Sequence, residues 1–465
     1  MKSKSRRKRV RGRNSGDSRK GVLETIHLNA SGIDIGGKSH WVAVPPDRSE
    51  SSVREFKCFT PDLHAIADWL EECGIDTVAM ESTGVYWVPL YEILEERGFE
   101  VLLVNAQHAK GVPGRKTDVV DCQWLQQLHT FGLLRSSFRP EESIVALRSL
   151  TRHREQLVKS AATCIHRMQK SLVLMNLHLH TVITDISGVT GLAILRDIAS
   201  GETSPETLAR HRSRRCRSTE AEIATALTGH YKPEQVFVLR QNLELYDSYE
   251  HQIAHCDQEI ESVLAQLEQD CETPDKPLEP SKKRIQIKAN SPRFDVRSPL
   301  YKICGGSDLT SLPGIGPSGA LTIISEVGTD MSHWETEKHF ASWLTLSTNN
   351  KISGGKVLAS RTRPSANRAT TTLRIAAMSI GRSDNELGAF YRRLSSRIGK
   401  AKATTATARK LAILVYRVLK DDLQYEERTA AEYDQKLKTR LTKNLQRRAA
   451  NLGYLLVEAD TGIVP

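Results

Sequence analysis

The chain has 465 residues, too many for one compact core, so several domains are expected. Apolar residues make up 39% of the sequence and charged residues 26%, which is typical of a folded protein and excludes a disordered or collagen-like chain. No apolar run is long enough to cross a bilayer, and the start of the sequence lacks the apolar stretch of a signal peptide. These features predict a cytoplasmic protein and exclude a membrane or secreted one.

Positive charge is concentrated at the N-terminus. The net charge is +11, and residues 1–20 hold ten basic residues against one acid, Asp17. Such a run cannot fold on itself, so residues 1–22 are predicted to form a disordered basic arm that lies along phosphates. A solubilising extension is an equally open alternative.

The cysteines show neither a metal-binding nor a disulfide pattern. Eight of them are scattered along the chain without a C-x-x-C pair, which argues against a zinc site and against a disulfide framework. His178 and His180 flank Leu179 on an apolar segment, where such pairs are more often structural than metal-ligating. We therefore expect buried, unpaired cysteines in a reducing compartment.

Residues 23–138 are predicted to form an α/β domain. Three closely spaced strand patterns indicate an antiparallel meander, and alternating helix and strand patterns follow it. This order is typical of an RNase H-like fold. We expect strands at 26–35, 40–44, 53–59, 77–81 and 100–105, and helices at 61–73, 85–97 and 117–134.

The remainder divides into a helical region and a second folded unit. Residues 139–271 show no strand pattern, and apolar side chains recur every seven residues from Leu239 to Leu267, as in a coiled coil. We expect this region to mediate oligomerisation, with packing against residues 147–168 of the same chain as the alternative. Residues 272–300 mix proline and charge, which is typical of a linker or an exposed insertion. A mainly helical unit is expected at 301–425 and a helical tail at 426–465.

Four acidic residues lie where predicted strands end or a helix begins. Asp34 lies in G-I-D-I-G-G, Glu81 ends the strand V-A-M-E, and Asp118 and Asp121 share one helix face in K-T-D-V-V-D. In an RNase H-like sheet these positions are neighbours, and their carboxylates would repel one another unless cations neutralise them. Two Mg²⁺ ions held by oxygen ligands are the usual machinery for attack on a phosphodiester. The pattern therefore predicts a Mg²⁺ centre that acts on nucleic acid.

Each acidic residue also fits a simpler structural role. Asp118 can cap a helix that starts after Thr117, and Glu81 can pair with a lysine. G-I-D-I-G-G also suits the phosphate turn of actin-like kinases, but the second glycine-rich turn and the adenosine motif of those enzymes are missing from the sequence. The candidate phosphate contacts beside the acids, which can equally be surface charges, are Lys38, Arg115 and Lys116.

The second unit carries two further nucleic-acid signals. L-P-G-I-G-P resembles a helix-hairpin-helix turn, in which the backbone at Gly314 and Gly316 can hold a phosphate; a plain interhelical turn is the alternative. Residues 351–383 contain seven basic residues and no acid, which favours a nucleic-acid surface over a solvated helix face. The candidate contacts are Lys351, Lys356, Arg361, Arg363 and Arg368.

A polar loop in this stretch, I-S-G-G-K, places the hydroxyl of Ser353 close to a lysine. A serine in such a loop can bind phosphate, shape a turn, or act as a nucleophile if its proton is removed. Composition does not choose between these roles. Ser347, Ser360 and Ser365 are nearby rivals.

Together these motifs resemble those of the DEDD transposases of bacterial insertion sequences (the IS-one-ten group). The resemblance covers most of residues 28–420 and implies a RuvC-like catalytic domain at 23–138 and a separate transposase domain, bearing the serine, at 301–425. It also implies a bacterial, nucleoid-associated protein. The matching pieces, in family order, are G-I-D-I-G, M-E-S-T-G, K-T-D-V-V-D, L-P-G-I-G-P, Ser353-Gly354, and G-K-A-K followed by R-K-L-A.

The resemblance further implies residue roles and partners. Asp34, Glu81, Asp118 and Asp121 would hold Mg²⁺, and Ser353 would attack DNA, displace a 3′-hydroxyl and form a 5′-phosphoserine link. The two domains of one composite site would come from different protomers of a dimer or tetramer. A structured guide RNA encoded by the element's flank would pair with donor and target double-stranded DNA and so choose the sequence.

Two other functions stay open. In a RuvC-like structure-specific endonuclease, metal-activated water would attack and Ser353 would only position phosphate. A noncatalytic RNA- or DNA-binding scaffold would bind without cleaving.

Overall fold

The computed structural model describes residues 24–105, 117–281 and 290–457. The chain divides into two compact units, an N-terminal unit of residues 1–139 and a C-terminal unit of residues 140–465. The predicted basic arm, Arg115 and Lys116 lie outside the described residues.

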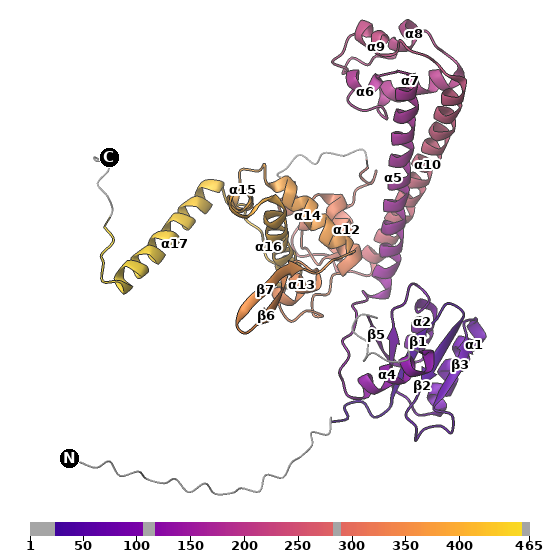
Figure 1. Ribbon diagram of the computed structural model, residues 1–465, viewed down its shortest axis with the longest axis vertical. Helices are drawn as coiled ribbons and strands as arrows, with labels where there is room; N and C mark the ends of the chain where they lie inside the picture. The colour runs from indigo at the N-terminus through magenta and orange to yellow at the C-terminus, as the bar shows by residue number, and fades with distance from the viewer. Residues whose placement is uncertain (1–23, 106–116, 282–289, 458–465) are drawn as a thin grey trace, which may run out of the picture. The chain divides into compact units, whose positions relative to one another are not determined.

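The N-terminal unit is built on one five-stranded sheet in the order β3-β2-β1-β4-β5 (Figure 1). The first three strands form the predicted antiparallel meander, whereas β1, β4 and β5 run parallel. The predicted strand at 77–81 is confirmed in full, and the first strand is shorter than predicted. The bounds are β1 Ala30–Ile35, β2 Ser39–Ala43, β3 Val53–Lys57, β4 Thr77–Glu81 and β5 Glu100–Val104.

Helices cover both faces of this sheet. The helices α1 (Thr60–Glu72) and α2 (Val88–Glu96) pack on the face that buries Ile33 and Met80. The helix α4 (Asp118–Thr130) packs on the other face, where Ala79 and Leu125 share a cluster. The helix and the strand approach closely at Gly32: a Cβ added there would lie 2.4 Å from the carbonyl oxygen of Cys122 and 2.3 Å from the amide nitrogen of Gln126. A glycine at position 32 therefore sets how near α4 approaches β1.

Two long helices, α5 (Glu142–Leu174) and α10 (Pro233–Gln269), pack along each other in the C-terminal unit (Figure 1). The heptad positions Leu239, Tyr246 and Ile253 are buried in one cluster with side chains of α5. The seam is thus filled by the same chain, which was the alternative to our prediction; oligomerisation itself stays a prediction. Short helices connect the two: α6 Leu179–Val182, α7 Val189–Ser200, α8 Pro205–Ala209 and α9 Glu220–Ala226.

The described parts of residues 272–300 include a mostly exposed stretch at 272–281, as an exposed insertion would, and they also contact the helices. Arg154 of α5 donates to the carbonyl oxygen of Asn290 at 3.0 Å, and Arg297 donates to that of Glu279 at 2.8 Å. The helix α11 (Arg297–Ile303) also begins within this segment. The acceptors in both hydrogen bonds are backbone carbonyls, which have no signature in the sequence.

The rest of the C-terminal unit is mainly helical, as predicted. The helix α16 (Lys400–Asp421) packs against α13, α14 and α15, and a two-stranded hairpin that we did not predict lies between α13 and α14 in sequence. The predicted tail contains the helix α17 (Ala430–Asn451), in which no residue is buried. The other bounds are η1 Leu309–Ser311, α12 Pro317–Val327, α13 Glu337–Trp343, β6 Thr348–Ser353, β7 Lys356–Thr362, α14 Arg368–Ile380 and α15 Glu386–Ile398.

Two predictions from composition can be compared with the described residues. None of their helices has the length and apolar character needed to cross a membrane. All eight cysteines are free thiols, but the burial that we expected holds for only four of them: Cys73, Cys122, Cys164 and Cys256.

Candidate functional site

Asp34 and Glu81 lie at the same edge of the sheet and on the same face. The strands β1 and β4 are parallel, and Ile33 pairs with Met80 as the last registered pair. Asp34 and Glu81 are the next residue of each strand, so their side chains point to the face opposite Ile33 and Met80. Because Ile33 and Met80 pack towards α1 and α2, both carboxylates lie on the face that α4 covers.

The first turn of α4 lies over this edge. Near the end of α4, Nε2 of His129 lies 2.8 Å from Oγ1 of Thr77, at the start of β4. One turn nearer the start of α4, Leu125 packs against Ala79 in the middle of β4. The helix thus runs opposite to β4, and one more turn towards its start brings Asp121 to the level of Glu81, with Asp118 in the turn before it.

The start of α4 is fixed by a side-chain cap. Oγ1 of Thr117 accepts a hydrogen bond from the amide of Val120 at 3.3 Å, so Thr117 is the N-cap and Asp118 is the first helical residue. Our alternative, in which Asp118 caps the helix, is therefore wrong. Carboxylates in a first turn are also stabilised by the helix dipole. Asp118 is exposed and Asp121 is half-buried.

The carboxylates near this edge affect the pKa of the buried Cys122 thiol. Its pKa is raised to about 12, first by desolvation and then by the negative charges of Asp34 and Asp121. Two of the predicted ligands, one from the sheet and one from the helix, therefore act on the same atom. This agrees with the register of α4 on β1.

Asp34 and Glu81 share the sheet edge, and Asp118 and Asp121 lie in the first turn of α4, but the four carboxylates do not form a cage. Oε1 of Glu81 accepts a hydrogen bond from Thr83 at 3.0 Å. Within residues 24–105, 117–281 and 290–457, no three His, Cys, Asp or Glu side chains are grouped so that they could hold a metal ion. The donor set nevertheless fits a hard divalent cation, because every donor is a carboxylate oxygen.

A glycine turn and an aromatic ring border the same edge. The turn from Gly36 to Ser39 joins β1 to β2 and carries the exposed Lys38. A Cβ on Gly37 would lie 3.3 Å from the ring of Tyr86, which is itself exposed. Lys38 is thus placed where it can contact phosphate, and Tyr86, which our sequence analysis missed, offers a face for stacking.

Ser353 lies at the tip of the β6–β7 hairpin in the C-terminal unit. The residues Gly354 and Gly355 form a two-residue turn with φ of 54° and 76°, values that favour glycine. Ser353 pairs directly with Lys356 across this turn, and both are exposed. The predicted polar loop is therefore a tight hairpin end that presents a serine and a lysine together.

The rival serines are placed differently. Ser347 precedes the hairpin and is half-buried. Ser365 accepts a hydrogen bond from the amide of Asn367 at 3.1 Å, just before α14. Ser360 is exposed on β7, where it pairs with Asn350.

The predicted basic contacts fall into two groups. Lys351, Lys356 and Arg361 are exposed on the hairpin, and no carboxylate among the described residues forms an ion pair with them. Arg363 donates to the carbonyl oxygen of Ser342 at 3.0 Å, and Arg368 pairs with Glu155 of α5 at 2.5 Å. The last two therefore have structural contacts of their own.

The L-P-G-I-G-P turn leads from η1 into α12. Gly314 has a φ of 75°, and a Cβ there would lie 2.9 Å from the carbonyl oxygen of Ala376 in α14. Gly316 is the N-cap of α12, without a side-chain cap and with open space around it. Packing thus explains Gly314, whereas the backbone at Gly316 is accessible to a phosphate.

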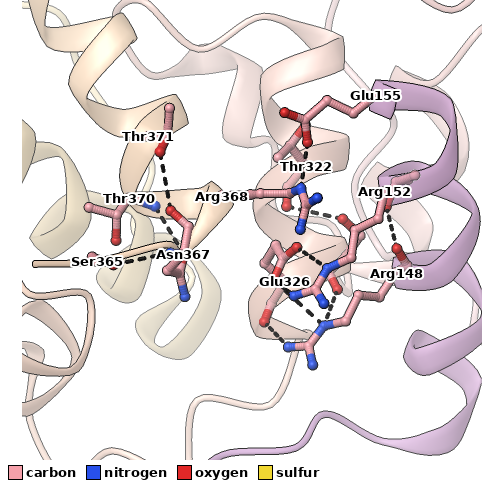
Figure 2. Close-up of polar contacts among 12 residues, drawn as sticks. Arg148, Arg152, Glu155, Thr322, Glu326, Ser365, Asn367, Arg368, Thr370 and Thr371 are labelled. Atoms are coloured by element: carbon pink, nitrogen blue, oxygen red, sulfur yellow. Dashed lines mark hydrogen bonds and ion pairs between the residues drawn. The ribbon is translucent and has the colours of Figure 1, made fainter. Parts of the chain in front are cut away.

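Ion pairs hold α5 against this part of the unit. Figure 2 shows Arg148 and Arg152 of α5 reaching Glu326 at the end of α12. Arg152 donates two hydrogen bonds to the buried Glu326 carboxylate, at 2.8 and 2.7 Å. The long helices α5 and α10 and the helices α12 to α16 are therefore parts of one packed unit.

Comparison with protein families adds two matches. Residues 31–177 match a model described as a DEDD-type IS110 transposase, and residues 306–392 match one described as the transposase IS116/IS110/IS902 family. The two matches include all four carboxylates and Ser353, and together they span about half of the chain. No curated protein matches the sequence. The chain therefore belongs to the IS110 family of DEDD transposases.

Proposed function

We propose that this transposase is a Mg²⁺-dependent DNA recombinase that cuts and rejoins strands through a 5′-phosphoserine at Ser353. The observation that carries the proposal is that Asp34 and Glu81 lie at the same end of neighbouring parallel strands, on the sheet face that α4 covers. The strand order β3-β2-β1-β4-β5 is consistent with an RNase H-like domain.

Asp34, Glu81, Asp118 and Asp121 would hold the cations, which we propose are two Mg²⁺ ions. When bound, the ions would offset the negative charge that develops on the phosphate oxygens and would help to ionise the attacking hydroxyl. The carboxylates supply the oxygen ligands, and Lys38 contacts a phosphate beside them. In the described residues the four side chains are not grouped closely enough to hold a metal ion, so binding would require them to move together.

Ser353 would supply the nucleophile. Its Oγ forms a bond to phosphorus and its proton leaves to a base. The bond from phosphorus to the 3′-oxygen breaks, and that oxygen takes up a proton from a general acid or water to leave as a 3′-hydroxyl. One phosphodiester is exchanged for another, so the strand can rejoin by the reverse step without an external energy source. The paired Lys356 places a positive charge beside the phosphate under attack.

The partners in this proposal are double-stranded donor and target DNA, a structured guide RNA and further copies of the chain. The basic hairpin and the open backbone at Gly316 would contact phosphates, which carry no sequence information. Base pairing with RNA would supply the sequence choice. Sequencing the RNA that copurifies with the protein tests this part: a structured RNA matching the element's flank is expected, and an absence of enrichment contradicts it.

The chemical part is tested by denaturing electrophoresis of cleavage reactions on DNA carrying the element's ends. We expect a covalent protein–DNA adduct in Mg²⁺ that is lost in Ser353→Ala and retained in Ser360→Ala, an exposed serine of the same hairpin. Asp34→Asn and Asp121→Asn should abolish both cleavage and adduct. Cleavage without an adduct would favour the alternative of a RuvC-like endonuclease that uses water, and binding without cleavage would favour a noncatalytic scaffold.

A further inference from the structure

The two faces of the β6–β7 hairpin differ in chemistry. Residues paired across an antiparallel ribbon lie on the same face, and successive residues alternate. Ser353 and its partner Lys356 therefore share one face with Lys351 and Arg361. This face, the serine face, carries the nucleophile of the proposed function and three positive charges.

The opposite face, the apolar face, exposes large hydrocarbon side chains at the tip. Ile352 pairs with Val357, and their side chains are 63% and 57% exposed. The register shifts beside this pair, which makes Leu358 an extra residue at a bulge, where the alternation of faces is interrupted. Leu358 follows Val357 directly and is 70% exposed. Three adjacent apolar side chains at a ribbon tip form a patch typical of a binding surface.

The hairpin has little support from its own unit. Among the described elements, β6 and β7 pack extensively only on each other, and the tip extends beyond the neighbouring helices (Figure 1). An isolated two-stranded ribbon is marginally stable in water. The apolar face is therefore positioned to gain burial when a ligand covers it.

Charge identifies that ligand as nucleic acid. Residues 348–363 contain four Lys or Arg residues and no Asp or Glu. A surface of one sign repels a second copy of itself and attracts a phosphate backbone. Proteins that engage DNA in this way also insert apolar side chains against its bases, which opens the stack.

We propose that the hairpin tip is a wedge: Ile352, Val357 and Leu358 lie against bases of the DNA duplex while the serine face holds the backbone of the strand to be cut. The inference rests on the proposed function for the identity of that strand. The side chains of the apolar face would separate the two stacked bases next to the attacked phosphate. Parting the bases there frees the backbone to approach Ser353.

The test uses the full chain with its copurified RNA and duplexes that carry the element's ends, each with 2-aminopurine at one position near the cut. Fluorescence should rise at one or two positions on saturation with wild type and with Ser353→Ala. The triple variant I352T/V357T/L358T has β-branched threonines, which suit a strand, at all three positions, so it should fold and bind, but the rise should be lost. Lys351→Ala is the matched control on the serine face. It should weaken binding and lower the salt slope by about 1, while the rise persists at saturation.

The outcomes separate the wedge from the chemistry. Position-specific fluorescence that depends on the three apolar residues supports the wedge even if wild type forms no serine adduct, in which case only the proposed function fails. No rise with saturating wild type, or an equal rise with the triple variant, overturns the wedge. A change in oligomeric mass of the triple variant without DNA would instead assign the apolar face to a second copy of the chain.

Discussion

Replacing Glu326 by glutamine tests whether ion pairs fix α5 to the transposase helices. The Glu326 side chain is 2% exposed, and Arg152 and Arg148 approach its carboxylate within 2.7 and 3.7 Å. Glutamine keeps the length of the side chain but turns an NH₂ group towards a guanidinium and leaves the Arg148 charge without its carboxylate. Removing one partner of a buried pair costs about 3–5 kcal/mol of unfolding free energy. Arg152 can recover water because it is 42% exposed, so we expect the lower end, about 3 kcal/mol.

The matched control is Glu337→Gln. Glu337 also pairs with an arginine, Arg417 at 2.9 Å, but its side chain is 28% exposed and that of Arg417 46%. Pairs of this kind contribute about 1 kcal/mol or less. Urea unfolding followed by circular dichroism gives both values, and hydrogen exchange of the α12 amides locates the loss. Equal losses in the two variants would refute the reasoning that burial of Glu326 sets the magnitude.

Three further predictions follow from the described residues. Asp257→Ala leaves the buried Arg154 without the carboxylate it contacts at 2.5 Å, so it should lower the free energy of unfolding by about 3 kcal/mol or more. Asp247→Ala removes an exposed pair with Arg196 and should lower it by less than about 1 kcal/mol, as urea unfolding of the two variants would show. Burial, and secondly the charge of His27, lowers the pKa of His129 from 6.5 to about 4. The unfolded state therefore binds the proton first, and the free energy of unfolding should fall by up to about 3 kcal/mol as the pH drops from 6.5 to 4. In His129→Gln, unfolding measured at a series of pH values should show a weaker dependence on pH. Because its pKa is about 12, the buried Cys122 thiol should react with iodoacetamide at pH 8 at least about 100-fold more slowly than the exposed Cys58, as mass spectrometry of labelled peptides would show; comparable rates would contradict the packing of α4.

The bounds of a strand could be predicted from the sequence where polar residues flank it. Where apolar alternation continued beyond the true end of a strand, it predicted the wrong bound. The strand 77–81 is bounded by Asp76 and Ser82 and is buried along its length up to Glu81. In contrast, Ile26 and Leu28 continue the apolar alternation of the first strand, yet they are 61% and 72% exposed. The amide of Ile26 bonds to the carbonyl oxygen of Thr130, outside the sheet. Periodicity alone does not distinguish such a segment from a strand.

The hairpin was missed because its strands have weak strand propensity. The segment T-N-N-K-I-S has one apolar residue, Ile352, and is exposed along its length, so it lacks the apolar alternation that marks most strands. The signal that could have found it is Gly354-Gly355, a two-residue turn of the kind that joins antiparallel strands. Recognising that turn would also have predicted that Ser353 and Lys356 are paired.

The carboxylate edge was predictable in kind but not in detail. Strand ends and an i, i+3 pair indicated Asp34, Glu81, Asp118 and Asp121. The register of α4, however, depends on the close approach of Gly32 to the backbone of Cys122 and Gln126, which are 90 or more positions away in sequence. Tyr86 was missed for the same reason, because its contact with Gly37 joins two loops that only the sheet brings together.

The most direct measurement of the central claim is mass spectrometry of protease-digested cleavage reactions, with Ser353 as the site examined. The account predicts a peptide in which the Ser353 hydroxyl carries a nucleotide through its 5′-phosphate, formed only when the four carboxylates and Mg²⁺ are present. Cut DNA with free 5′-phosphates and an unmodified Ser353 peptide throughout the reaction would contradict it.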